Sequence, residues 1–200
     1  MTKTIETIQT PSDDECGIVA TFSEQSLNNL TEIQDKLSES LGDAIWLTPR
    51  RALHSTLMEI ICDIEYATPR HELFARWNAQ YGQSVSEILS EIATFEISFS
   101  EIEVSKRAII VRSATSVSFN SIRSKLLSKI DLPKGTKLPP DITHCTLARY
   151  NRSLDLEKVI ASTQHLRCDF TEPIAAFKLL KDLGPPSFDP KTIQEYSFLA

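Results

Sequence analysis

The chain carries the pattern His-x-Thr-Leu twice. One copy runs from His54 to Leu57, and the other runs from His144 to Leu147. Both lie in short apolar surroundings typical of β-strands, where residues i and i+2 point to the same face. Each copy would therefore present one imidazole and one hydroxyl on one face, about 7 Å apart along the strand. Together they would supply two groups that exchange protons and two neutral hydrogen-bond donors.

These side chains suit an attack on a phosphodiester without a metal ion. Histidine has a pKa of about 6.5, so one imidazole can accept a proton while the other donates one. A threonine hydroxyl can donate a hydrogen bond to a non-bridging phosphate oxygen, where charge accumulates in the transition state. We therefore predict that the catalytic residues are His54, Thr56, His144 and Thr146. We expect no metal site and no cofactor, because no third ligand is evident near either motif.

A His-x-Thr pattern in a strand can also be a satisfied, half-buried polar pair without any chemistry. A single copy would favour that ordinary interpretation, because short motifs recur by chance. The two histidines, however, are 144 − 54 = 90 residues apart in matched surroundings, and both copies continue with leucine. The repetition favours a functional site.

Two residues after the second motif are candidates for binding a substrate. Arg149 could bind a phosphate or form a surface ion pair. In a regular strand it would point away from the face of His144, so the first role requires a bulge or a strand end. Tyr150 shares the facing of His144 and could either stack on a nucleobase or pack in the core. Cys145 should point to the opposite face and be buried.

The elements that would carry the motifs repeat in the order strand, amphipathic helix, motif strand. The first strands begin near Ile18 and Ile109, an offset of 109 − 18 = 91 that agrees with the offset of the histidines. We predict two pseudo-repeat halves, near 17–61 and 108–150, with an insertion at 62–94. The apolar positions of the two helices are Leu27, Leu30, Ile33, Leu37 and Leu41 in the first and Phe119, Ile122, Leu126, Leu127 and Ile130 in the second.

Within the insertion, two features interrupt the helical pattern. Thr68-Pro69-Arg70 breaks the chain, and Tyr81-Gly82 resembles a second break between two short helical segments. The insertion could form a lid over the site, a specificity element or a surface for a protein partner.

Length and composition indicate one globular domain. With 200 residues, 41% of them hydrophobic, the chain can bury a sizeable core. We expect residues 1–16 to form a flexible N-terminal tail and residues 17–200 to form a single bilobal domain. The four cysteines form no C-x-x-C pair, and no segment resembles a signal peptide or a membrane span. We therefore expect a reduced, cytoplasmic protein without membrane contact.

The net charge of 21 − 27 = −6 argues against nonspecific binding to duplex DNA. A small anionic ligand remains compatible with this charge, because a pocket can be locally positive on an acidic protein. The charge balance therefore favours a nucleotide or an RNA end as the partner.

The two motifs, their spacing and the repeated element order resemble the 2H phosphoesterase superfamily. This is the LigT-like group, whose members include RNA 2′,3′-cyclic phosphodiesterases historically called 2′-5′ RNA ligases. The second motif continues as His-Cys-Thr-Leu-Ala-Arg, a form often seen in that family, whereas the first continues with Met58-Glu59. The resemblance implies an α+β fold in which two antiparallel-rich sheets face a central cleft, with helices outside.

The same resemblance implies a function. It implies metal-independent cleavage of a nucleotide 2′,3′-cyclic phosphate, or of a related 2′-5′ or cyclic oligonucleotide phosphodiester bond, by a monomer. By resemblance, His54 is assigned as the general acid and His144 as the general base. The alternative is a non-catalytic module that binds a nucleotide or an RNA end in the same cleft, because the motif residues would serve both functions.

Overall fold

The computed structural model describes most of the chain. The described residues are 14–62, 64–115, 117–138, 141–184 and 187–199. Residues 1–13 of the expected tail therefore lie outside the described residues. The end of that predicted tail belongs to the fold instead, because Glu15 is buried and the first strand begins at Cys16. The carbonyl of Glu15 accepts a hydrogen bond from the amide of Leu183 at 3.2 Å.

Nine strands and four α-helices are present in the described part of the chain. In order they are β1 (Cys16–Thr21), α1 (Glu24–Leu41), β2 (Ile45–Leu47), β3 (His54–Ile61), α2 (Arg70–Ser90), β4 (Phe95–Val104), β5 (Ala108–Ser113), α3 (Val117–Leu127), β6 (His144–Tyr150), α4 (Leu156–Thr163), β7 (Phe170–Ile174), β8 (Ala176–Lys181) and β9 (Lys191–Ser197). Two short 3-10 turns, Gly42–Ala44 and Arg50–Ala52, flank β2.

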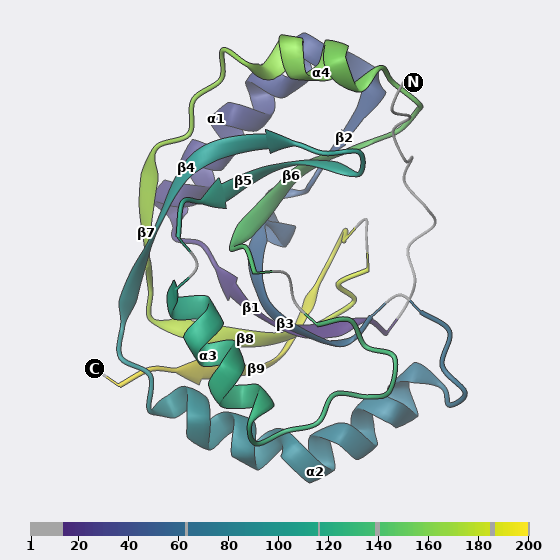
Figure 1. Cartoon of the computed structure of the whole chain (residues 1–200), viewed down its shortest axis with the longest axis vertical. Helices are drawn as coiled ribbons and strands as arrows, with labels where there is room; N and C mark the ends of the chain where they lie inside the picture. The colour runs from purple at the N-terminus through teal and green to yellow at the C-terminus, as the bar shows by residue number, and fades with distance from the viewer. Residues whose placement is uncertain (1–13, 63, 116, 139–140, 185–186, 200) are drawn as a thin grey trace.

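The described strands form one curled antiparallel sheet. Its order is β7-β4-β5-β6-β3-β1-β8-β9, and β2 also pairs with β6. The two halves of the sheet join where β3 meets β6, at the pair Ser55 and Cys145. Helices α1 and α4 lie at one end of the molecule, and α2 and α3 lie at the other (Figure 1). The predicted α+β fold is confirmed, and the two expected sheets are the two halves of this single sheet.

Helix α1 forms where the apolar pattern predicts it. The hydroxyl of Ser23 caps its N-terminus by accepting a hydrogen bond from the amide of Ser26 at 3.3 Å. Leu30 and Leu37, on its apolar face, are fully buried. The helix stops at Gly42, whose φ of 54° lies in the left-handed region that favours glycine. Helix α3 occupies the corresponding place between β5 and β6, so both halves contain the order strand, helix, motif strand, with β2 as an addition in the first half.

The insertion forms one long helix, α2. The predicted break at Tyr81-Gly82 is wrong, because the helix continues through both residues. A single glycine lowers helix stability by only about 1 kcal/mol, and here Trp77 on one side and Val85 on the other are buried in the core. The indole of Trp77 also donates a hydrogen bond to the carbonyl of Asp131 at 2.8 Å. No residue of α2 is among those that line the cleft described below.

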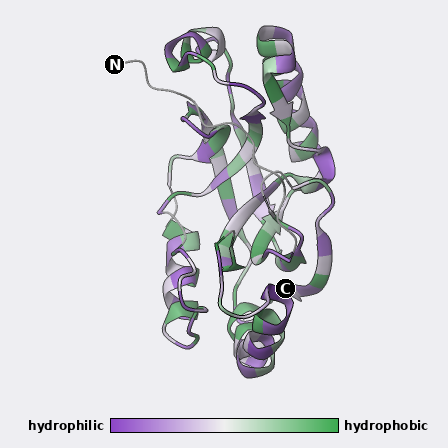
Figure 2. Cartoon of the chain, turned by 90° about the vertical axis from the view of Figure 1, so that its right-hand side faces the viewer, coloured by the Kyte–Doolittle hydropathy of each residue, from purple (hydrophilic) through white to green (hydrophobic). Residues whose placement is uncertain are grey.

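Hydrophobic and hydrophilic residues alternate along the elements, as amphipathic helices and strands require (Figure 2). Among the described helices, none is long and apolar enough to cross a membrane. In the two motif strands, Ser55 and Cys145 lie with 1% and 0% of their surface exposed. The prediction that Cys145 is buried is confirmed, and the histidines and threonines beside these two residues lie on the opposite face.

Candidate active site

The two motif strands run side by side. β3 and β6 are antiparallel, and Ser55 lies opposite Cys145, so the middle residues of the two motifs are partners. The hydroxyl of Ser55 also donates a hydrogen bond to the carbonyl of His144 at 2.8 Å. Antiparallel pairing about this point sets each motif histidine opposite the threonine of the other motif. The two histidines then occupy diagonal positions, whose Cα atoms are typically about 7–8 Å apart.

All four predicted catalytic side chains line one cleft. They are His54, Thr56, His144 and Thr146. Each of them is partly exposed, so a ligand in the cleft can reach it. The cavity volume is about 240 Å³, which is below the range of about 300–1,000 Å³ for pockets that enclose drug-sized ligands. The cleft can therefore enclose a small ligand or part of a larger one.

Each imidazole is anchored on the backbone two residues before it. Nδ1 of His54 lies 2.8 Å from the carbonyl oxygen of Ala52. Because a carbonyl can only accept a hydrogen bond, Nδ1 must carry the proton. His144 makes the equivalent hydrogen bond with the backbone of Ile142. In His54, this arrangement leaves Nε2 as the nitrogen that can exchange a proton with a ligand.

The surroundings of both imidazoles favour the neutral form at pH 7. Burial lowers the pKa of His144 to about 4, and the charges of His54 and Arg123 act in the same direction. Burial also lowers the pKa of His54, against the hydrogen bond to Ala52. A phosphate placed between the rings would raise both pKa values, because a nearby opposite charge favours the protonated form. We therefore expect an anion to bind to this cleft together with a proton.

The lowered pKa of His144 predicts that the protein loses stability as the pH falls. The unfolded chain takes up this proton near pH 6.5, whereas the folded chain takes it up near pH 4. The contribution of neutral His144 to the free energy of unfolding is thus fully present above pH 6.5. It is lost from pH 6.5 toward pH 4, by at most about 1.4 kcal/mol per pH unit. Urea unfolding at several pH values measures this slope, which His144→Gln should reduce. Equal slopes in the two proteins would contradict the prediction.

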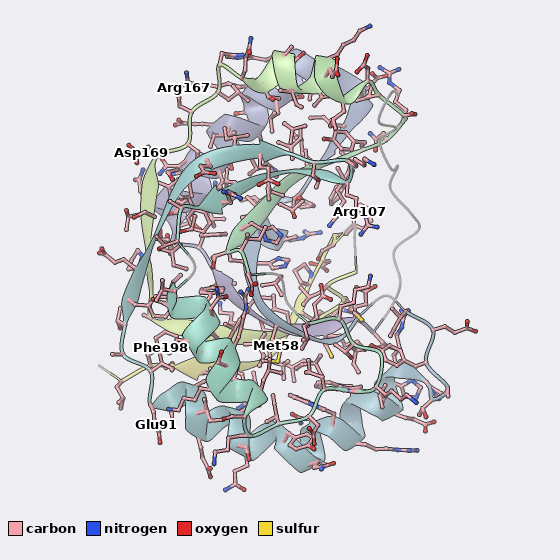
Figure 3. The ribbon with its side chains drawn as sticks, viewed as in Figure 1. Met58, Glu91, Arg107, Arg167, Asp169 and Phe198 are labelled. Carbon is pink, nitrogen blue, oxygen red and sulfur yellow. The ribbon has the colours of Figure 1, made fainter. Side chains whose placement is uncertain are left out.

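A β-bulge follows each motif. The register of β3 against β1 shifts at Leu57, and the register of β6 against β5 shifts at Leu147. One extra residue reverses the facing of the residues that follow it. Met58 is therefore fully buried (Figure 3), and Arg149 lines the cleft. Arg149 therefore lies on the cleft side of β6, and its binding of a phosphate stays a prediction.

Buried side chains from two helices support the bulges. Arg123 on α3 is 4% exposed and donates hydrogen bonds to the carbonyls of Thr56 at 2.9 Å and Leu57 at 2.7 Å. Gln34 on α1 is also buried and donates to the carbonyl of Leu147 at 2.8 Å. Buried backbone carbonyls at a bulge need hydrogen-bond partners where the ladder is interrupted, and the carbonyl of Leu147 also accepts a hydrogen bond from the amide of Thr48 at 2.9 Å. Each bulge is thus supported by the helix of the opposite half.

The bulge in β6 also turns Tyr150 away from the cleft. Its side chain is fully buried, and its hydroxyl donates a hydrogen bond to the carbonyl of Ser105 at 2.9 Å. Core packing is therefore the correct alternative for Tyr150. The aromatic residue that lines the cleft is Trp46, which lies opposite Arg149 in the pairing of β2 with β6. No sequence pattern distinguishes Trp46, because a strand of three residues shows no periodicity.

Three charged residues that the sequence analysis did not select also line the cleft, and the first of them is Glu15, just before β1. Glu59 follows the bulge of β3, and Lys137 comes from the segment before β6. Arg107, in the turn between β4 and β5 (Figure 3), is not among the lining residues but lies within electrostatic reach of Arg149. Burial and the charge of Arg107 both lower the pKa of the Arg149 guanidinium. The cleft thus combines the cations Lys137 and Arg149 with two acidic groups, Glu15 and Glu59.

Comparison with solved structures relates this fold to known proteins. TT0787 of Thermus thermophilus matches with a TM-score of 0.60 and 15% identity, over 92% of this chain and 97% of that chain. E. coli LigT in its apo form matches with a TM-score of 0.61 and 12% identity, over 94% of this chain and 100% of LigT. This protein has a LigT-like fold. The resemblance to 2H phosphoesterases predicted from the motifs is therefore confirmed for the fold.

Other LigT-like structures agree with this result. A protein described as a phosphoesterase matches with a TM-score of 0.55 and 11% identity, over 94% of this chain and 99% of that chain. E. coli LigT has also been solved in complexes with phosphate and with 3′-AMP. No family model and no curated protein matches the sequence of this chain. The LigT-like likeness therefore rests on the fold.

Proposed function

We propose that this protein is a metal-independent phosphodiesterase that hydrolyses a nucleotide 2′,3′-cyclic phosphate or a related 2′-5′ or cyclic oligonucleotide phosphodiester bond. The main support is that two imidazoles and two threonine hydroxyls, from motifs far apart in the sequence, line one cleft. A purely binding site has no need of two groups that transfer protons. The LigT-like fold supports a phosphoesterase-type enzyme.

In the proposed reaction the two histidines act in turn. Neutral His144 accepts a proton from a water molecule as the water oxygen forms a bond to phosphorus. The bond from phosphorus to one ribose oxygen breaks, and protonated His54 donates its proton to that oxygen. His54 becomes protonated because the anionic phosphate beside it raises its pKa. The product is a nucleoside phosphomonoester, and each proton transfer contributes about 10²- to 10⁴-fold to the rate.

The remaining cleft residues would bind the charge and the base. Thr56 and Thr146 donate hydrogen bonds to the non-bridging oxygens, and Arg149 can form a bidentate contact with the same group. Trp46, on the strand beside Arg149, offers an aromatic face on which a nucleobase can stack. The complex of LigT with 3′-AMP supports a nucleotide as the ligand of this cleft.

Incubation with 2′,3′-cyclic AMP in the presence of EDTA tests the proposed function. We expect conversion to an adenosine monophosphate, detected by chromatography, at a rate that EDTA does not change. The physical reason is that no group of three or more His, Cys, Asp or Glu side chains in the described residues is arranged to hold a metal ion. Saturable binding of cyclic and 2′-5′ substrates without product would instead support a nucleotide-binding module. Activity lost with EDTA and restored by zinc or manganese would contradict the metal-independent mechanism.

A further inference from the structure

The approximate twofold repeat places Glu59 in the position of Arg149. Glu59 is the fifth residue after His54, and Arg149 is the fifth residue after His144. Each is separated from its motif by a bulge, and both line the cleft. The two halves of one cleft therefore present opposite charges at equivalent positions, so a ligand meets a different group on each side.

Glu59 places a carboxyl group in a cleft that is proposed to bind an anion, and its negative charge opposes that binding. The side chain of Glu59 is exposed at the cleft surface, but the surrounding cleft atoms partly desolvate its carboxyl group and raise its pKa, and the charges of Lys137 and Arg149, within electrostatic reach, oppose that rise. As a carboxylate it repels a phosphate, so the phosphate should lie toward Arg149 rather than toward Glu59. A carboxylate also has no proton to donate and accepts hydrogen bonds from N–H and O–H groups. The part of the ligand beside Glu59 should therefore be an uncharged hydrogen-bond donor.

The backbone opposite Glu59 is built to allow this placement. Glu59 pairs with Gly17 on β1, and a Cβ atom at Gly17 would lie 2.7 Å from the carbonyl oxygen of Met58. Such a distance is a clash, so a larger residue would force β1 and β3 apart at this point. The close approach of the two strands thus fixes the backbone that carries Glu59.

We propose that Glu59 is a specificity-determining residue that accepts a hydrogen bond from the nucleoside and disfavours substrates carrying a second phosphate on that side. The donor is either the N–H edge of the base or the free 5′-hydroxyl of the ribose. This proposal rests on the proposed function, because it assigns the orientation of a nucleotide in the same cleft.

Four substrates and the isosteric variant Glu59→Gln test this proposal. The substrates are the 2′,3′-cyclic phosphates of guanosine, which has base N–H donors, and of N3-methyluridine, which has none, each with a 5′-hydroxyl or a 5′-phosphate. The wild type should prefer guanosine or the 5′-hydroxyl form in kcat/KM by about tenfold or more, the effect of one hydrogen bond to a charged group. Glu59→Gln should remove most of that preference. A base preference identifies the base edge as the donor, and a 5′ preference identifies the ribose.

The control is Glu39→Gln, which changes an exposed carboxylate of α1 outside the cleft and should leave every ratio unchanged. The proposal is overturned if Glu59→Gln changes kcat/KM for all four substrates by one common factor, or if it leaves every ratio of kcat/KM between substrates unchanged. If the wild type turns over none of them, the phosphodiesterase proposal fails. In that case titration calorimetry measures Kd for the four matching nucleoside 3′-phosphates in the wild type and in Glu59→Gln. The ratios of Kd between these ligands then decide the role of Glu59.

Discussion

Replacing His54 or His144 by alanine should lower the turnover of a 2′,3′-cyclic nucleotide by at least about 100-fold. Each change removes one of the two proton transfers, and the threonines and Arg149 can still bind the phosphate. We therefore expect the loss in kcat rather than in KM. Steady-state kinetics on 2′,3′-cyclic AMP measures both constants. The double variant should be little worse than either single variant, because the two groups act in one reaction.

A surface histidine provides the control for these variants. His165 is exposed and lies outside the cleft, so His165→Ala should keep full activity. Circular dichroism and urea unfolding should show that the inactive variants retain the fold, because both imidazoles are partly exposed at the cleft surface. Unchanged kinetics in either single variant would remove that histidine from the mechanism.

Replacing Arg123 by methionine should destabilise the protein by about 2–4 kcal/mol. Methionine keeps much of the apolar stem, but it donates no hydrogen bond to the carbonyls of Thr56 and Leu57, which Arg123 contacts at 2.9 and 2.7 Å. Leaving buried carbonyls without partners costs about 1–3 kcal/mol each. Urea unfolding measures the difference, and a decrease in Tm of roughly 5–15 °C should accompany it.

Arg76→Met is the matched control for Arg123→Met. Arg76 lies on α2, is largely exposed and forms an ion pair with Glu72 at 3.3 Å. Such pairs contribute about 0.3–0.5 kcal/mol, so the unfolding midpoint should barely move. Arg123→Lys keeps one charged donor and should fall between Arg123→Met and the wild type. An unfolding midpoint of Arg123→Met equal to that of the wild type would show that the bulge carbonyls do not depend on Arg123.

Much of the fold could be predicted because it depends on strong local patterns. The period of Leu30 and Leu37 marks α1, and the cap at Ser23 marks its start. His54 follows Ile18 by 36 residues and His144 follows Ile109 by 35. This nearly equal spacing indicated a repeat, and a repeat implies that equivalent strands can meet. The same local reasoning failed at Gly82, where burial of the flanking apolar residues of α2 outweighs the weak helix propensity of one glycine.

The facing of residues beyond the motifs could not be predicted, since it depends on contacts distant in sequence. The bulge at Leu57 is supported by Arg123, 66 residues away, and the bulge at Leu147 by Gln34, 113 residues away. Regular alternation therefore placed Tyr150 on the wrong side and gave no reason to select Glu59. A repeated five-residue spacing from each histidine to a charged residue was the one signal that could have indicated both cleft positions.

Each bulge is supported by a helix of the other half, so each half of the site depends on the folding of the other half. Helix α1 belongs to the first half but holds the motif strand of the second, and α3 of the second half holds the motif strand of the first. A fragment containing one half would keep its own histidine and threonine but lack the side chain that shapes its strand. Catalytic geometry should therefore arise in a single all-or-none step, when both halves are folded against each other, and no intermediate with half of the site should retain partial activity.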